Sequence, residues 1–161
     1  MPTALELRTL ALEMKAAQDS AHQVEPFTTR LPTFDLSAAY EVAHLIHRAR
    51  VTEGAKPIGR KIGFTNPDMW SKFGVREPIW AHIYDTTVVQ LQDVQATCRL
   101  GGFVEPKIEP EIVFRFRTAP RAGAGLIDVV NAIDLDLPNM RIQQSNVPLG
   151  HSCGLLKAGL G

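Results

Sequence analysis

Two glutamates, Glu109 and Glu111, lie two positions apart in a segment, residues 101–116, that largely alternates apolar and polar side chains. In a β-strand, positions two apart lie on one face, so the two carboxylates would share a face. Carboxylate oxygens suit Mg²⁺ or Mn²⁺, and a pair of them could hold the ion open to a chelating substrate. A solvated charged face that includes Lys107 and Arg115 explains the same residues, and spacing alone favours that second interpretation.

A lysine and two histidines are the other candidates for chemistry. Lys61 lies between Gly59 and Gly63, where the backbone and the ammonium group could both approach a small anion such as a 2-oxo acid carboxylate. A lone lysine in a strand is more often a surface residue. His44 and His47 have helical spacing and could bind a metal, but without a third ligand nearby we expect surface or packing histidines.

Four aromatic residues occur around the turn at Pro78, namely Trp70, Phe73, Trp80 and Tyr84. We expect them to pack a lid or a core, and they could wall a pocket, instead of stacking on nucleic-acid bases. The sequence contains no phosphate-binding loop, no dinucleotide-binding fingerprint and no Gly-x-Ser-x-Gly elbow. Nucleotide, nicotinamide and serine-hydrolase chemistry therefore have no support from motifs.

The composition is that of one globular domain. The chain has 161 residues, of which 45% are hydrophobic and 21% charged, enough for a single core. Lysine plus arginine and aspartate plus glutamate each number 17, so we expect neither a nucleic-acid partner nor an anionic membrane partner. Charged residues interrupt the N-terminal run "MPTALELRTLALEMKAAQ", and no apolar stretch reaches transmembrane length, so we expect a cytoplasmic protein.

Helical patterns dominate the N-terminal part of the chain. Apolar spacing predicts a helix over residues 3–20 and a second helix that is capped by Asp35 or Ser37 and ends near Gly54. A further helix is predicted over residues 126–135.

After residue 56 the sequence changes to short β-prone runs punctuated by Gly, Pro and Asn. We therefore expect a single α+β domain with a helical region over residues 1–56 and a sheet-rich region over residues 57–161. The predicted strands are "IGRKIGFT" (58–65), "IWAHIYD" (79–85), "TTVVQL" (86–91) and "EPKIEPEIVFRF" (105–116).

Three motifs in order carry a family resemblance: a Gly-x-Lys-x-Gly strand, a Gly-Val-x-x-Pro turn and a Pro-x-x-Glu-x-Glu-Ile strand. Over roughly residues 5–134 the chain resembles the fumarylacetoacetate hydrolase superfamily, in the branch of 2-oxopent-4-enoate hydratases and 2-oxo-hexenedioate decarboxylases. The resemblance implies two N-terminal helices packed on a mixed β-roll, which would be incomplete here because the chain ends early. An incomplete roll would leave an exposed strand edge and an open apolar face, so we expect a homo-oligomer.

The resemblance assigns roles to specific residues. It implies that Glu109 and Glu111 are two of three carboxylates that hold Mg²⁺ or Mn²⁺, and that Lys61 is catalytic and contacts the substrate. Asp85, close to the Gly-Val-x-x-Pro turn, is a further candidate substrate ligand. The expected activity is that of a divalent-metal-dependent lyase acting on a small 2-oxo acid in aromatic-compound catabolism, a hydratase of the 2-hydroxypenta-2,4-dienoate type.

Two departures from the family pattern keep other functions open. Ile79 stands where hydratases of this branch often carry an acid, so a general base is unassigned. Arg141 stands where the third metal carboxylate is expected, and a cation there would weaken metal binding. The first alternative is therefore an inactive family fragment or a partner-dependent non-catalytic subunit. The second is a 2-oxo acid decarboxylase or carbon–carbon hydrolase of the same superfamily.

Overall fold

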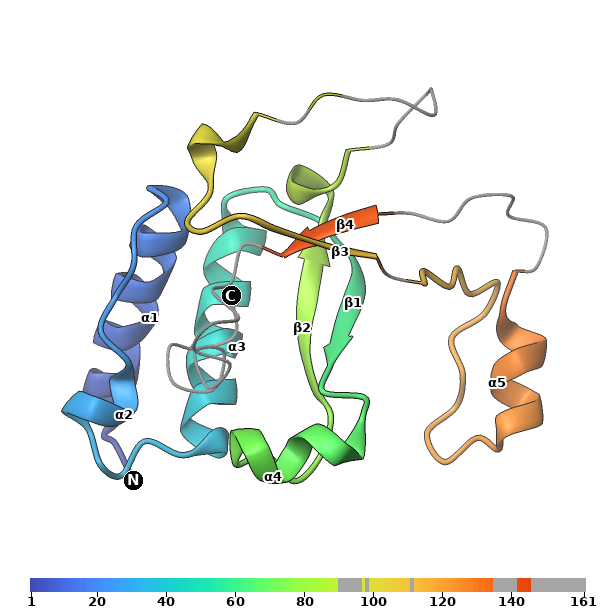
Figure 1. Ribbon diagram of the computed structural model, residues 1–161, viewed down its shortest axis with the longest axis horizontal. Helices are drawn as coiled ribbons and strands as arrows, with labels where there is room; N and C mark the ends of the chain where they lie inside the picture. Colours follow the sequence, from blue (N-terminus) through green and yellow to red (C-terminus); the bar gives the residue numbers. More distant parts are fainter. Residues whose placement is uncertain (90–96, 98, 111, 135–141, 146–161) are drawn as a thin grey trace. The chain divides into compact units, whose positions relative to one another are not determined.

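The computed structural model describes residues 1–89, 97, 99–110, 112–134 and 142–145 (Figure 1). The described chain divides into two compact units, the first within Met1–Pro106 and the second within Lys107–Ser145.

Two long helices begin the first unit, and local capping explains where they start. Helix α1 spans Ala4–Asp19 and opens with a capping box in which the Thr3 and Glu6 side chains each accept from the other's backbone N–H. Helix α3 spans Leu36–Thr52, and the Asp35 carboxylate accepts a hydrogen bond from the Ala38 N–H at 2.9 Å. Both predicted helices are confirmed, and the cap of the second is Asp35.

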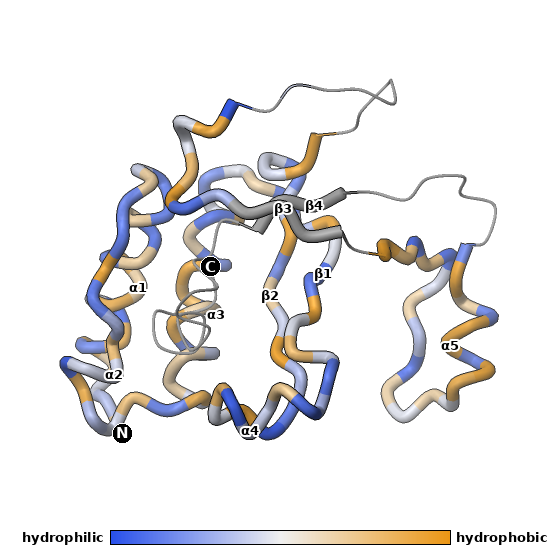
Figure 2. The backbone as a smooth tube through the Cα atoms, viewed as in Figure 1, coloured by the Kyte–Doolittle hydropathy of each residue, from blue (hydrophilic) through white to orange (hydrophobic). Residues whose placement is uncertain are grey.

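The core of the first unit lies between α1 and α3, which run side by side (Figure 1), and it includes the short helix α2 (Phe27–Arg30). Phe27 and Val42 are the largest side chains that are fully buried. Figure 2 shows hydrophobic and hydrophilic residues alternating along both long helices, as expected for helices with one buried face. The buried members of this core are Leu10, Ala11, Met14, Phe27, Phe34, Ala38, Ala39, Val42 and Ile46.

A two-stranded antiparallel hairpin follows the helices. Strand β1 (Pro57–Gly63) pairs with β2 (Ile79–Tyr84), with Gly63 opposite Ile79 and an irregularity between Pro57 and Gly59. The connection contains the short helix α4 (Trp70–Phe73), which ends at Gly74 in the left-handed conformation, φ 68°.

The predicted strand at residues 86–91 is wrong in its described part. Residues Asp85–Thr87 instead form a 3-10 turn after β2. The Thr87 hydroxyl donates to the Tyr84 carbonyl at 3.0 Å. Such local side-chain bonds compete with strand pairing and outweigh the β-propensity of the valines that follow.

The second unit holds β3 (Lys107–Pro110), which pairs antiparallel with β4 (Ile142–Ser145), and helix α5 (Leu126–Ala132). The long strand predicted over residues 105–116 is wrong at residues 112–115, which are not in a strand, and Phe116 makes a single bridge with Ile133. The apolar face expected there is not buried, since Ile112 is 74% exposed and Phe114 56% exposed. Proline at position 110 has no N–H to donate, which favours an early end to the pairing.

The α+β class is confirmed by this combination of helices with small antiparallel strand pairs. The mixed roll is not seen in the described part of the chain, where both strand pairs are antiparallel. No helix among these residues is long and apolar enough to cross a membrane.

Candidate functional site

Lys61 lies in the middle of β1, opposite Ala81 of β2. Residues directly opposite in an antiparallel pair share a face, so Lys61 and Ala81 project from one face of the hairpin. The neighbouring pairs, Arg60 with His82 and Ile62 with Trp80, project from the other face. Lys61 is partly buried. The strand therefore separates this lysine from the aromatic and histidine side chains of β2.

Two glycines flank Lys61 on its own face, because Gly59 and Gly63 lie two residues to either side. A methyl group added at Gly59 would meet no atom within 4 Å, and one added at Gly63 would touch only the Ile79 side chain, at 3.6 Å. Neither glycine has the positive φ that would require glycine. The described structure thus gives no backbone reason for these glycines, and their effect is to leave open space beside Lys61.

Asp85 lies at the base of the hairpin, directly after β2. Its carboxylate accepts a hydrogen bond from the Lys56 N–H at 2.9 Å, and its own N–H donates to the Lys56 carbonyl at 3.0 Å. Lys56, the partner of Asp85, precedes Lys61 by five residues, roughly 16 Å along a strand. The contacts of Asp85 therefore show a hairpin-closing role, and its role as a substrate ligand stays a prediction.

The predicted metal ligands fall in the second unit. Glu109 lies in β3, in register with Gln143 of β4. Glu111 and Arg141 lie outside the described residues. Among the residues that are described, no group of three or more His, Cys, Asp or Glu side chains could hold a metal ion. Because the Glu109 side chain and the whole of Glu111 lie outside the described part of the chain, the predicted carboxylate site stays a prediction.

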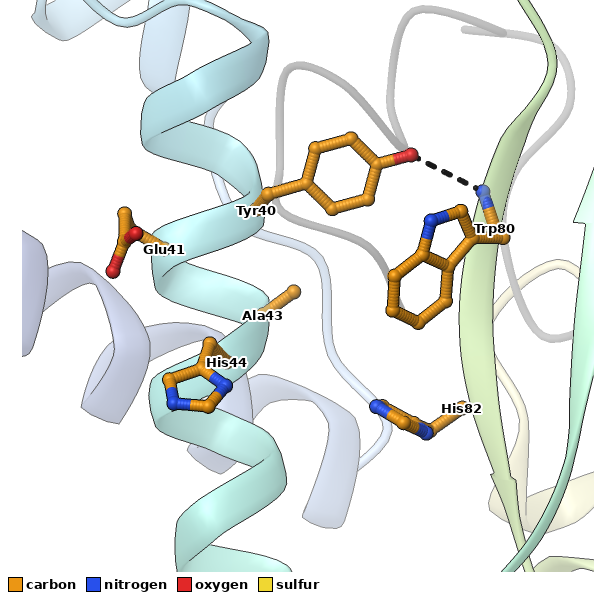
Figure 3. Close-up of a pocket in the computed structure, with 6 residues that line it drawn as sticks. All are labelled: Tyr40, Glu41, Ala43, His44, Trp80 and His82. Atoms are coloured by element: carbon orange, nitrogen blue, oxygen red, sulfur yellow. Dashed lines mark hydrogen bonds between the residues drawn. The ribbon is translucent and has the colours of Figure 1, made fainter. Parts of the chain in front are cut away.

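A groove of about 400 Å³ opens on the other face of the hairpin, between β2 and α3 (Figure 3). The Tyr40 hydroxyl accepts a hydrogen bond from the backbone N–H of Trp80 at 3.3 Å across one end of the groove. Figure 3 shows the Trp80 indole and the His82 ring directed from β2 toward the helix. Of the aromatic residues around Pro78, Trp80 thus walls a pocket, as the sequence suggested. The residues that line the groove are Tyr40, Glu41, Ala43, His44, Trp80 and His82.

Histidines connect α3 to β2 beside this groove. The His47 and His82 rings stack with centroids 3.9 Å apart and an interplanar angle of 17°. A hydrogen bond of 3.0 Å joins His47 Nδ1 to the Tyr84 hydroxyl. His47 is therefore a packing residue, in agreement with the sequence expectation for the histidine pair of α3.

The charges around this cluster are mostly positive. The Arg60 guanidinium lies over the Trp80 ring, 4.3 Å from its centroid, in a cation–π contact. Burial, followed by the charges of His47, Arg60 and His44, lowers the pKa of His82 below its ordinary range. Burial also raises the pKa of the Tyr84 hydroxyl, although the charge of Arg50 opposes the shift. Both groups are therefore held neutral near pH 7.

Sequence reasoning missed Arg60, His82 and Tyr40 as members of this cluster. Alternation along β1 and β2 could have placed Arg60 and His82 on one face of a hairpin, because the two strands were both predicted. The partner helix and the register could not be read from the pattern, because they depend on how α3 packs against the strand.

Comparison with known proteins finds relatives described as hydratases and decarboxylases. No protein-family model matches the chain. A 2-keto-4-pentenoate hydratase of Dechloromonas aromatica is 28% identical over 135 residues, 83% of this chain and 50% of the relative. A 4-oxalocrotonate decarboxylase of Pseudomonas sp. strain CF600 is 30% identical over 142 residues, 87% of this chain and 52% of the relative. The chain therefore spans about half the length of the relatives it matches.

Solved structures agree with the sequence comparison. The 4-oxalocrotonate decarboxylase of Pseudomonas putida G7, complexed with calcium and acetate, matches with a TM-score of 0.74 and 28% identity, over 83% of this chain and 51% of that protein. The same enzyme complexed with magnesium and adipate matches with a TM-score of 0.68 and 27% identity, over 83% of this chain and 50% of that protein. These names confirm the predicted resemblance to the hydratase and decarboxylase branch.

Proposed function

We propose, from the likeness to 2-keto-4-pentenoate hydratases and 4-oxalocrotonate decarboxylases, that this chain carries part of the site of a divalent-metal-dependent lyase. The substrate class is a small 2-oxo acid, and the reaction is hydration of the 2-hydroxypenta-2,4-dienoate type in aromatic-compound catabolism. In its finer fold we propose the mixed β-roll that the resemblance implies. The observation that carries the proposal is the space beside Lys61, which is open at Gly59 and bounded only by the Ile79 side chain at Gly63.

That space suits a small anion. Glycine inside a strand destabilises it by roughly 0.5–1 kcal/mol relative to alanine, so two glycines around one lysine need a compensating reason. A planar 2-oxo acid carboxylate could lie against the backbone at Gly59 and Gly63 while the Lys61 ammonium donates a charge-assisted hydrogen bond to it. Lys61 would thereby orient the acid and stabilise negative charge on its oxygens.

The donor set also suits a hard cation. Glu109 and Glu111 supply carboxylate oxygens, the ligand type that Mg²⁺ and Mn²⁺ prefer, and Mg²⁺ is commonly held by one or two carboxylates together with its substrate. A bound ion would supply Lewis-acid polarisation of the 2-oxo group. With Arg141 at the position of the third carboxylate, we expect weak metal binding.

Loss of 2-hydroxypenta-2,4-dienoate, followed by its absorbance with Mg²⁺ or Mn²⁺ present, tests the activity. Lys61→Met should abolish turnover. Gly59→Ala should leave the fold intact, because its new methyl group meets open space, and should lower turnover by crowding the substrate. The matched control is Arg60→Gln, since Arg60 is adjacent but lies on the other face and should leave activity near the wild-type level.

The metal is tested separately by titrating Mn²⁺ into the full chain and measuring water proton relaxation. Glu109→Gln and Glu111→Gln should each remove binding, whereas Glu105→Gln, an exposed residue of the first unit, should not. Arg141→Glu should tighten binding by restoring a third carboxylate. Equal Mn²⁺ affinity in the wild type, Glu109→Gln and Glu111→Gln would contradict the metal assignment.

The second candidate is a non-catalytic family fragment or a partner-dependent subunit, and Arg141 favours it. If the wild type shows no turnover with either metal, and Lys61→Met and Gly59→Ala are equally inactive, the non-catalytic candidate is the one that remains. Carbon dioxide release from 4-oxalocrotonate without hydratase activity would instead indicate a decarboxylase.

A further inference from the structure

The stacked histidines join two elements of the first unit that are far apart in sequence. His47 comes from α3 and His82 from β2, and both rings are partly buried. On the far side of the stack His47 is bonded to Tyr84, which is 8% exposed and closes β2. On the near side the edge of Trp80 meets His82, with centroids 5.2 Å apart and an angle of 87°. Two imidazoles therefore lie at the centre of the contact between the helix and the hairpin.

The groups that face the stack are predominantly basic. Helix α3 contributes His44, whose ring is 6.5 Å from that of His47, and Arg50, whose charge acts on Tyr84. Strand β1 contributes Arg60, whose charge acts on His82. The acid that lines the groove, Glu41, is exposed, and Arg50 is paired with Asp19 at 3.0 Å. No hydrogen bond or ion pair among the described residues joins a carboxylate to either stacked ring.

This environment tolerates neutral imidazoles and opposes imidazolium. Two planar neutral rings attract by stacking, whereas two protonated rings at the same separation repel each other and the neighbouring arginines. Burial and the adjacent positive charges both lower the pKa of His82, so folded His82 stays neutral at a pH where unfolded His82 binds a proton.

We propose that the His47–His82 stack is an acid-sensitive clamp, which holds the β1–β2 hairpin against α3 while His82 is neutral and releases the hairpin when His82 is protonated. The hairpin also carries Lys61, so release would change the position of that lysine relative to the helices. The clamp itself does not depend on the proposed function, because it rests on contacts within the first unit alone.

The direction of the pH effect follows from proton binding. Because the folded pKa of His82 is lowered, the unfolded chain binds more protons as the pH falls below the ordinary histidine value near 6.5. The contribution of His82 to stability is complete above that value. It is lost as the pH falls through the window between that value and the lowered pKa of folded His82. Within this window the folding equilibrium constant falls by up to about tenfold per pH unit for one such histidine.

The first test is urea unfolding of the full chain at pH 8 and pH 5. His82→Phe keeps a planar ring against His47 but cannot bind a proton, so the loss of stability between the two pH values should be smaller than in the wild type. His22→Gln is the matched control, because His22 is exposed and its ring forms a hydrogen bond with the neighbouring Ser20 hydroxyl, at 2.8 Å. It should retain the wild-type pH dependence. Equal pH dependence in the wild type and His82→Phe would overturn the clamp.

The second test needs no histidine substitution and remains decisive if His82→Phe does not fold. The chain has two tryptophans, so Trp70→Phe leaves Trp80 as the single emitter, next to His82. Protonated imidazole quenches indole emission more strongly than neutral imidazole does. Emission of the native chain should therefore fall with acid, with a midpoint below 6.5. A midpoint at or above that value, or constant emission from pH 8 to pH 5, would refute the proposal.

Discussion

Tyr84 lies where the hairpin packs against α3, and its hydroxyl and its ring can be removed one at a time. The side chain is 8% exposed, and its hydroxyl is 3.0 Å from His47 Nδ1. Its ring centroid lies 5.9 Å from that of His47 and 6.2 Å from that of His82. Tyr84→Phe removes only the hydrogen bond, whereas Tyr84→Ala also removes the buried ring.

The two substitutions should differ several-fold in their effect on the free energy of unfolding. An intramolecular hydrogen bond contributes about 0.5–1.5 kcal/mol net, and partly buried His47 can bond to water instead, so we expect Tyr84→Phe to cost about 1 kcal/mol. Replacing a buried aromatic ring by alanine costs about 3–5 kcal/mol, from lost burial and the cavity left behind. Since small domains are stable by about 5–15 kcal/mol, Tyr84→Ala should remove a large part of the total.

Urea unfolding at pH 7.5, followed by far-ultraviolet circular dichroism, measures both effects. With a slope of roughly 2 kcal/mol per molar urea, the midpoint should fall by about 0.5 M in Tyr84→Phe and by about 2 M in Tyr84→Ala. Tyr40→Phe is the control, because the Tyr40 hydroxyl makes a longer bond of 3.3 Å at the partly exposed edge of the groove. It should shift the midpoint less than Tyr84→Phe.

Destabilisation of Tyr84→Ala by less than about 1 kcal/mol, well under the cost of losing a buried aromatic ring, would refute this packing contact. That result would mean that the hairpin does not pack on α3 through Tyr84. A Tyr84→Phe variant as stable as the wild type, with Tyr84→Ala strongly destabilised, would instead assign the contact to ring packing alone.

Two further predictions concern the helices. Asp35→Ala should lower the free energy of unfolding by about 1 kcal/mol, because the Ala38 N–H loses its cap, and chemical denaturation would detect the change; no change would rule out this cap as stabilising. Burial raises the pKa of Asp19, but bonds and charges from Lys15 and Arg50 outweigh it and lower the pKa below the ordinary 3.8. The contribution of Asp19 is thus present above that value and lost as the pH falls below it, so Asp19→Asn should be less stable than the wild type at pH 7 and the gap should narrow at pH 3. A gap that persists in acid would show that the carboxylate charge is not its source.

The helices of the first unit could be predicted because their signals are local. The Asp35 side chain caps a backbone N–H three residues away, and the apolar spacing of α1 and α3 needs only a few turns to be recognised. The same holds for the Gly-x-Lys-x-Gly strand, whose alternation places Lys61 and its glycines on one face before any partner strand is known. A local signal misled at residues 105–116, because alternation predicted a long strand and residues 112–115 are not in a strand.

Only the tertiary structure decided which distant side chains meet. His47 and His82 are 35 positions apart, and their stacking depends on the register of β1 with β2 and on how α3 packs against the hairpin. The sequence likewise suggested Asp85 as a candidate substrate ligand near a turn, whereas in the fold its carboxylate accepts a hydrogen bond from the Lys56 N–H. The physical reason is that side-chain type and spacing set which faces an element has, but contacts across elements depend on docking, in which many weak packing terms compete at once.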